Sequence, residues 1–312
     1  MSREAAFIAR LATIARHPAA RGLKDDVAVL PLGDRDLVLT HDMLVEGIHY
    51  LPTDPPGDVA WKLVAVNLSD LAAKGARPLG ALMGYMLGRD TAWDAAFVDG
   101  LGRALERFDL PLLGGDTVAA PPATAQALGL TAIGETIPGQ APSRSGARAG
   151  DALWVTGRIG AASLGLAVAR MVAEEPESLL DSIEAEQLAT YRRPVPRLAE
   201  GRRLAAHVHA MADVSDGLLI DAVRLAEASG LAVTIDLERV PFTVSVAPTR
   251  DGRLAAASAG DDYELLFAAP ADIDRTLAQA TCIGGFRDGA GLSIVDAGGW
   301  VPTPERLGYE HA

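Results

Sequence analysis

Six aspartates of this 312-residue chain stand in positions where aspartates are uncommon, at the ends of expected strands or among small apolar residues. Carboxylates normally lie on exposed helix faces or in loops, because burying an unpaired charge is costly. The number of these residues favours one shared acidic pool over separate internal ion pairs. They are Asp26, Asp42, Asp70, Asp116, Asp213 and Asp216.

The stretch 58–74 contains the clearest case. It predicts a helix that is apolar nearly all round and is therefore buried. Asn67, Asp70 and Lys74 fall at i, i+3 and i+7, so they form a polar seam along one face. Taken alone, Asp70 is explained by an internal lysine or by backbone donors. Taken with the other aspartates, it belongs to the acidic pool.

Converging carboxylates repel one another, and a divalent cation removes that repulsion. Oxygen ligands suit Mg²⁺, Mn²⁺ or Ca²⁺ rather than zinc. The six histidines show no ligand spacing, there is no Cys/His cluster, and no EF-hand loop is present. Mg²⁺ usually shares its coordination with substrate phosphates, so the pool points to nucleotide chemistry.

Two glycine-rich turns could support phosphates. "TGRIGAASLG" at 156–165 follows an expected strand and opens a helix, so its backbone N–H groups could meet an anion. In "GGDT" at 114–117, the glycines allow close approach of backbone to a ligand. Either turn alone is weak support, because such turns often serve only packing. P-loop, protein-kinase and serine-hydrolase motifs are absent.

The elements that must position these residues alternate between strands and helices. Ala210–Val214 reads as a short buried strand, followed by a helix that Ser215 or Asp216 could cap and that Gly230 ends. The main expected strands are 25–32, 36–45, 80–87, 111–116, 124–136, 152–156, 231–241, 263–270 and 281–286, and the main expected helices are 58–75, 91–109 and the stretch after 160.

The composition shifts at the Pro-, Gly- and Ser-rich loop 137–151, which predicts a boundary between two α/β domains. We assign residues 1–140 to an amino-terminal domain with a mixed sheet and helices. Residues 149–312 form a carboxyl-terminal α/β sandwich. The amino end, around Phe7, predicts an ordinary amphipathic helix rather than a signal peptide.

The bulk composition limits the partners. A net charge of −13 makes nucleic acid and anionic membranes poor partners. No run of about 18 apolar residues indicates a membrane span. The one cysteine, Cys282, suits a reducing compartment. We therefore expect a cytoplasmic protein.

A set of motifs, in a fixed order from about residue 24 to 268, resembles the thiamine-monophosphate kinase family of the aminoimidazole ribotide synthetase-like superfamily. The ordered set is more specific than any single motif. The motifs are "KDDVAVL", "THDMLVEGIHY", "NLSDLAAKGARP", "LLGGDTV", "SRSGARAGD", "VTGRIGAASLGL", "DVSDGLLID" and "GDDYELLF".

The resemblance implies transfer of the γ-phosphate of ATP to thiamine monophosphate, several Mg²⁺ ions, and a homodimer formed through strands of the amino-terminal domain. No side chain needs to act as a covalent catalyst or strong base, because the acceptor phosphate is itself a nucleophile. The implied metal ligands are Asp26, Thr40, His41 (through its backbone carbonyl), Asp42, Asp70, Asp116, Asp213 and Asp216. Gly115, Asp116, Arg144 and Ser215 match positions around ATP, and His49, Asp261 and Tyr309 match positions near the thiamine substrate.

The chain departs from the family pattern at four positions. Lys24 replaces the usual Gly, and Lys74 replaces the Met of "AMGA". His41 replaces Thr, so a side-chain hydroxyl is lost while the backbone carbonyl remains. Asp261 replaces Glu and is one methylene shorter, a change in the expected substrate pocket.

Some of these residues also have ordinary explanations. Asp25 is interpreted as a turn residue or as one that orients Asp26, and Ser69 as a small packing residue. "RRPVPR" at 192–197 reads as a turn with solvated charges. His49 alone fits a half-buried structural histidine, and Arg144 a solvated loop cation.

Two other functions stay open on the residues. One is another ATP-using member of the superfamily, such as aminoimidazole ribotide synthetase. Selenophosphate synthetase and the hydrogenase-maturation relative would need cysteines that this chain lacks near its ends. The second is a catalytically silent nucleotide and Mg²⁺ sensor, against which the near-complete aspartate set argues.

Overall fold

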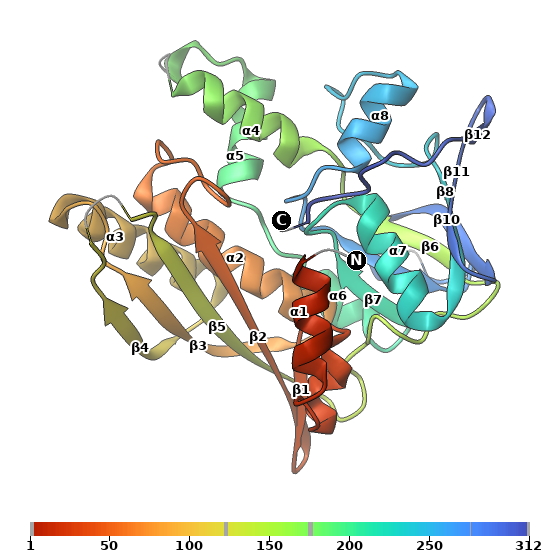
Figure 1. The fold of residues 1–312 in the computed structure, drawn as a ribbon, viewed down its shortest axis with the longest axis horizontal. Coiled ribbons are helices and arrows are strands. Elements are labelled where there is room, and N and C mark those ends of the chain that lie inside the picture. Colours follow the sequence, from red (N-terminus) through yellow and green to blue (C-terminus); the bar gives the residue numbers. More distant parts are fainter. Residues whose placement is uncertain (1–2, 122–123, 174–176, 275, 311–312) are drawn as a thin grey trace.

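The computed structural model describes residues 3–121, 124–173, 177–274 and 276–310, which form two sheets flanked by helices (Figure 1). The amino-terminal sheet has the strand order β1-β2-β5-β3-β4. The carboxyl-terminal sheet has the order β12-β11-β8-β10-β6-β9-β7. The predicted fold class, two mixed α/β domains, is confirmed.

The amino-terminal sheet is antiparallel except for the parallel pair β3–β4. Its strands are β1 (Ala28–Leu32), β2 (Arg35–Val45), β3 (Arg77–Met86), β4 (Leu112–Val118) and β5 (Ala127–Thr136). Alternation along β2 turns Val38, Thr40 and Leu44 inward, where they are buried. The same alternation puts Asp42 on the inner face.

Helix α2 (Pro56–Ala73) is the central element of the molecule, and α3 (Thr91–Phe108) packs beside it. From Val59 onward nearly every residue of α2 is buried, as its all-round apolar pattern predicts. The helix contacts strands of both domains. It therefore carries its polar residues into the junction between the two domains.

The carboxyl-terminal strands are β6 (Ala152–Thr156), β7 (Ala210–Asp213), β8 (Leu231–Asp236), β9 (Leu265–Ala269), β10 (Ala280–Asp288), β11 (Gly291–Asp296) and β12 (Gly299–Val301). The helices are α4 (Ala161–Val172), α5 (Ser182–Arg192), α6 (Leu198–Leu204), α7 (Leu218–Ser229) and α8 (Arg250–Ala257), with a short 3-10 turn at Glu177–Leu179. No helix among the described residues is long and apolar enough to cross a lipid bilayer.

The predicted amino-terminal helix is confirmed as α1 (Arg3–Ala12), which is followed by a 3-10 turn at Pro18–Leu23. None of its residues is buried, and Phe7 is 62% exposed. One sequence expectation needs correction. The "RRPVPR" stretch is not a solvated turn throughout. Arg192 is buried, and its Nε donates to Asp54 Oδ1 at 2.9 Å, because this end of α5 packs beneath the loop before α2.

Backbone contact joins the two domains where α6 crosses α2. A methyl group on Gly201 would stand 1.9 Å from the carbonyl oxygen of Ala72. We expect Gly201→Ala to lower the free energy of unfolding by about 1–3 kcal/mol, because overpacking forces the helices apart. Denaturant unfolding measures this loss.

Gly102 supplies the matched control, because it lies in α3 and a methyl group added to it would meet no neighbouring side chain or strand within 4 Å. Gly102→Ala should raise stability by about 0.5–1 kcal/mol through helix propensity. Equal effects of the two substitutions would contradict the close contact between α2 and α6.

Candidate active site

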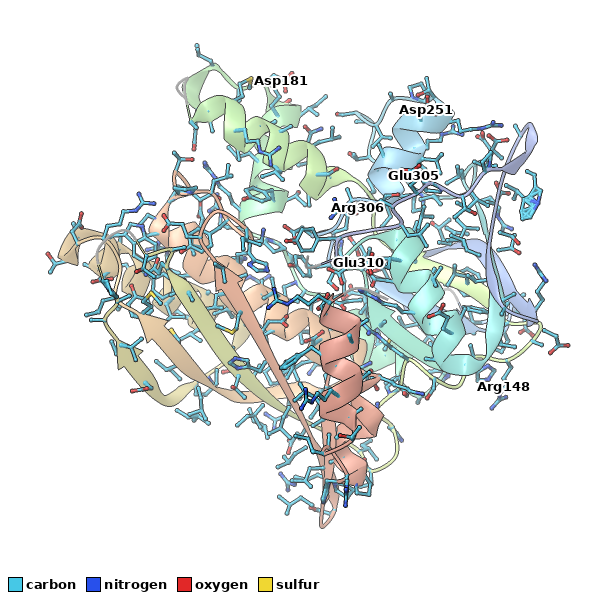
Figure 2. The ribbon with its side chains drawn as sticks, in the orientation of Figure 1. Arg148, Asp181, Asp251, Glu305, Arg306 and Glu310 are labelled. Carbon is cyan, nitrogen blue, oxygen red and sulfur yellow. The ribbon has the colours of Figure 1, made fainter. Side chains whose placement is uncertain are left out.

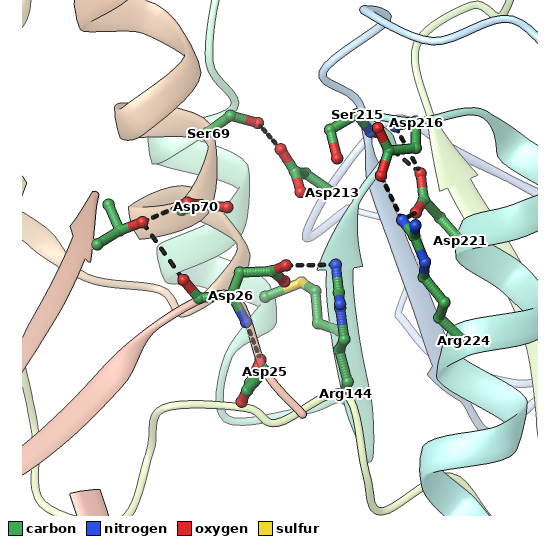
Figure 3. Close-up of polar contacts among 12 residues, drawn as sticks. Asp25, Asp26, Ser69, Asp70, Arg144, Asp213, Ser215, Asp216, Asp221 and Arg224 are labelled. Carbon is green, nitrogen blue, oxygen red and sulfur yellow. Dashed lines mark hydrogen bonds and ion pairs between the residues drawn. The ribbon is translucent and has the colours of Figure 1, made fainter. Parts of the chain in front are cut away.

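Three aspartates from both domains converge at the junction (Figure 3). Asp26 precedes β1, Asp70 lies on α2, and Asp213 ends β7. Each of them offers a carboxylate oxygen, and these oxygens all lie within 4.8 Å of one another. The sequence prediction of a shared pool therefore holds for these three residues.

Neighbouring hydroxyl groups orient two of the three carboxylates. Thr40 on β2 donates a short hydrogen bond to Asp70, and Ser69 Oγ donates to Asp213 Oδ2 at 2.5 Å. Ser69 thus positions a pool member and is more than a packing residue. Asp26 Oδ2 and Asp213 Oδ1 are buried and accept no hydrogen bond from any described residue. Buried carboxylate oxygens without donors fit a divalent cation as the missing partner.

Burial and mutual repulsion raise the pKa values of the pool. The pKa of Asp213 rises to about 8, first through burial and then through the charge of Asp26. The pKa of Asp42 rises to about 6 through burial and through Asp26 and Asp216. Burial, followed by its acidic neighbours, raises the pKa of Asp70 well above the usual range. Without a cation, the folded protein therefore holds protons here near neutral pH.

A buried ion pair lies under Asp26. Lys74 is fully buried, and its Nζ lies 2.6 Å from Asp25 Oδ1. The Asp25 carboxylate also pairs with Arg21 and accepts the backbone N–H of Asp26 at 3.1 Å. Burial raises the pKa of Asp25, but Lys74 and Arg21 more than offset this, so the pKa is lowered. Asp25 therefore orients Asp26, and Lys74 pairs with Asp25 rather than with Asp70.

Arg144 faces the pool from the loop between the two sheets. It forms a close ion pair with Asp26. Its Nε is buried and has no hydrogen-bond partner among the described residues. The planar guanidinium of Arg144 thus has an N–H group, Nε, that is unpaired among the described residues and lies beside the acidic pool. Such a donor suits a phosphate group.

The loop after β7 is held by a residue that sequence reasoning missed. Asp221 Oδ2 accepts the backbone N–H groups of Ser215, Asp216 and Gly217 at 3.1, 3.1 and 3.2 Å. The predicted capping of α7 by Ser215 or Asp216 is therefore wrong, because a first-turn aspartate gathers the N–H groups instead. The predicted end at Gly230 is confirmed by its left-handed backbone.

Asp216 also pairs with a cation of its own. Arg224 Nη1 lies 2.5 Å from Asp216 Oδ2 and 2.9 Å from Asp221 Oδ1 (Figure 3). Asp216 lies outside the tight cluster but close enough to raise the pKa of Asp42. Arg224 follows Asp221 by three residues on α7, and this spacing could have predicted their ion pair from the sequence.

A buried lysine contacts two of the expected substrate residues. Lys62 Nζ on α2 donates to Asp261 Oδ2 at 2.6 Å and to the carbonyl of His49 at 3.0 Å. The structure thus brings His49 and Asp261 to one point. We did not predict a role for Lys62. Its position inside an otherwise apolar helix could have indicated that it has a buried partner.

The carboxyl-terminal segment returns to the loop that carries Asp216. The backbone N–H of Tyr309 donates to the Asp216 carbonyl at 2.9 Å. Figure 2 shows Arg306 and Glu310 on this segment. The structure therefore places the backbone of Tyr309 against that of Asp216.

One predicted ligand, the Asp116 carboxylate, does not join the pool within one chain. The strand pairing puts Asp116 in line with Met43 on the outer face of the sheet, three strands or about 14 Å from β2. The His41 side chain also lies on that face, where its Nδ1 is 2.9 Å from Thr131 Oγ1. The ligand predicted for His41 is its backbone carbonyl, which stays a prediction. A methyl group on Gly115 would meet the Met83 carbonyl at 2.0 Å, so strand packing requires a glycine there.

The glycine-rich turn before α4 is already occupied. Asp262 Oδ2 accepts the N–H of Gly160 at 2.8 Å, so a side chain stands where the sequence suggested an anion. Burial raises the pKa of Asp262 to about 7, although the backbone donors lower it in part. A methyl group on Gly157 would meet Glu264 Oε1 at 1.9 Å. The turn serves packing and helix capping.

The fold and site together define an AIR synthase-related protein. Residues 24–136 match the family model described as AIR synthase related protein, N-terminal domain. Residues 148–296 match the model described as AIR synthase related protein, C-terminal domain.

Within that class, the chain belongs to the thiamine-monophosphate kinase family. It is 40% identical to the thiamine-monophosphate kinase of Caulobacter vibrioides, over 94% of this chain and 86% of that protein. It is 36% identical to that of Escherichia coli strain K12, over 93% and 91% of the two chains.

Solved structures agree with this assignment. "AaThiL complexed with AMPPCP and TMP" has a TM-score of 0.86 and 27% identity, covering 97% of this chain and 96% of that one. The thiamine-monophosphate kinase of Stenotrophomonas maltophilia K279a has a TM-score of 0.76 and 36% identity, covering 91% and 93%.

Proposed function

We propose that this chain transfers the γ-phosphate of ATP to thiamine monophosphate and forms thiamine diphosphate. The observation that carries the proposal is the pool at Asp26, Asp70 and Asp213, in which buried oxygens of Asp26 and Asp213 lack hydrogen-bond donors among the described residues. Membership of the thiamine-monophosphate kinase family and similarity to a structure that holds AMPPCP and TMP support it.

The proposed metal ligands are Asp26, Thr40, Asp42, Asp70, Asp213 and Asp216, with the His41 carbonyl and Asp116 as further candidates. Bound Mg²⁺ supplies charge neutralisation between two anionic phosphates. Ser69 and Thr40 hold their carboxylate partners in place. Asp25 fixes the main chain of Asp26 from the opposite side.

Different residues around the pool bind the two substrates. Arg144 and Ser215 bind ATP in this proposal, with the Arg144 guanidinium directed at phosphate oxygens. His49, Asp261 and Tyr309 bind thiamine monophosphate. No strong base is needed, because the acceptor phosphate is already ionised near neutral pH.

An end-point assay tests the reaction. Purified protein is incubated with ATP, Mg²⁺ and thiamine monophosphate, and the products are separated by chromatography. We expect thiamine diphosphate in the presence of Mg²⁺ and none after chelation. Bound ATP without thiamine diphosphate would overturn the proposal in favour of another acceptor or a silent sensor.

We also propose that two copies of the chain associate through the outer face of the amino-terminal sheet. Met43, Leu82, Leu113 and Val118 expose about half of their surface there. Asp116 stands among them, so a covering copy would bury this carboxylate and require a cation or donor beside it. Burial in a dimer interface would explain how Asp116 could be a metal ligand although it lies on the outer face of the sheet.

Leu113→Asp tests this surface, because it places a charge in the middle of the apolar face. We expect the wild-type protein to elute as a dimer and the variant as a monomer in size-exclusion chromatography with light scattering. Trp300→Asp, at an exposed site in the other domain, is the control and should leave the dimer intact. A monomeric wild-type protein would contradict the proposal.

A cytoplasmic location is also proposed. The single cysteine, Cys282, is consistent with a reducing compartment. Recovery of activity in the cytoplasmic fraction of cells would test it.

A further inference from the structure

Lys62 occupies an unusual environment for a lysine. It lies on α2 with 2% of its surface exposed. Its Nζ bonds the Asp261 carboxylate and the His49 carbonyl, and it stands 4.2 Å from the centre of the Tyr191 ring. The ammonium group therefore meets an anion, a carbonyl dipole and an aromatic face. These partners come from both domains.

Hydrogen bonds fix both the side chain and the backbone of Asp261. Its Oδ1 accepts the Tyr263 hydroxyl at 3.0 Å, and its Oδ2 accepts Lys62. Its backbone is left-handed, at φ +71°, and the backbone N–H donates to the Ser215 carbonyl at 2.8 Å. Tyr263 is also left-handed, at φ +49°, and its N–H donates to the Val214 carbonyl at 2.8 Å. Such conformations persist only where surrounding contacts fix them.

The paired groups still face accessible space. About a third of the Asp261 side chain remains exposed, at 35%, whereas the Lys62 side chain is at 3%. A ligand can therefore reach the carboxylate of Asp261, whereas the ammonium group of Lys62 is covered. The lysine sets both the position and the net charge of this surface.

We propose that Lys62 is a positioning residue for the acceptor substrate, acting through Asp261 and His49. This inference rests on the proposed function and adds a residue to its acceptor site. Lys62 ties the amino-terminal domain to the loop that carries Asp261, so the two substrate-binding residues keep one relative position. Without the ammonium group, Asp261 would present an uncompensated negative charge toward a phosphorylated substrate.

The test is the steady-state kinetics of Lys62→Met, with both substrates varied. We expect KM for thiamine monophosphate to rise about tenfold or more, because binding of the acceptor is what the lysine supports. KM for ATP should change by less than about twofold. Lys62→Arg, which keeps the charge, should restore most of the loss. Arg250→Met, which breaks an exposed ion pair between α8 and Asp296, should behave like wild type.

A double-mutant cycle separates positioning from folding. In an Asp261→Asn background, Lys62→Met should raise KM for the acceptor much less than it does in wild type, because the partner charge is already gone. An unchanged KM in Lys62→Met, or equal losses for both substrates, would overturn this inference while leaving the reaction intact. A wild-type protein that forms no thiamine diphosphate would overturn the proposed function and this inference together.

Discussion

Asp70→Asn is expected to reduce thiamine diphosphate formation at least about a hundredfold, because the acidic pool loses one negatively charged carboxylate ligand for the cation. The same substitution is expected to raise the melting temperature of the cation-free protein at pH 8. Asp70 is buried beside three other carboxylates, so its ionised form costs stability there. Product chromatography and thermal unfolding measure the two effects.

Asp36→Asn is the matched control for this prediction. Asp36 lies on the same strand as Thr40 and Asp42, is also buried, and accepts the Gly139 N–H at 2.8 Å. It lies outside the acidic pool, so we expect some loss of stability without loss of turnover. If Asp70→Asn lowered activity and stability together, the loss would reflect misfolding rather than a missing ligand.

Mg²⁺ binding at pH 7 is expected to release about one proton or more, because the pool must ionise to accept a cation. Asp213, with a pKa of about 8, is mostly protonated at that pH. Calorimetric titration in two buffers of different ionisation enthalpy counts the protons. Equal binding heats in the two buffers would show that the pool is already ionised.

The same pKa values give a direction for stability. Ionisation in the unfolded chain occurs near pH 4, whereas Asp42 and Asp213 ionise near 6 and 8 in the folded protein. The folded state thus binds more protons across this window, and cation-free stability falls as pH rises through it. Stabilisation by Mg²⁺ should accordingly be larger at pH 8 than at pH 6, as measured by melting temperature.

Much of the site was predictable because burial leaves a visible mark on the sequence. Asp70 interrupts an apolar helix, and Asp213 ends a short apolar strand. Residues of this kind stand out against the local pattern, since a buried charge requires a partner. The fold class followed in the same way from alternating strand and helix periods.

Two of the missed residues, Lys62 and Ser69, have partners that are distant in the chain. Lys62 meets Asp261, 199 residues away, and Ser69 meets Asp213, 144 residues away. Local periodicity carries no information about such pairs. Asp116 is the reverse case, a residue that was predicted for the pool but lies elsewhere. Its motif resembles that of the family, but the strand register turns its side chain to the outer face of the sheet. Which carboxylates share a site depends on register and topology, which appear only in the folded chain.

The contact between Gly201 and the Ala72 backbone restricts how this protein can protect its reaction from water. Many phosphate-transferring enzymes close two lobes over their substrates, and that closure excludes solvent. Here α2 and α6 pack so closely that a methyl group on Gly201 would overlap the Ala72 carbonyl, and this contact opposes sliding of one helix past the other. We therefore expect smaller segments to shield the transferred group, such as the stretch around Tyr309, whose backbone N–H donates to the Asp216 carbonyl.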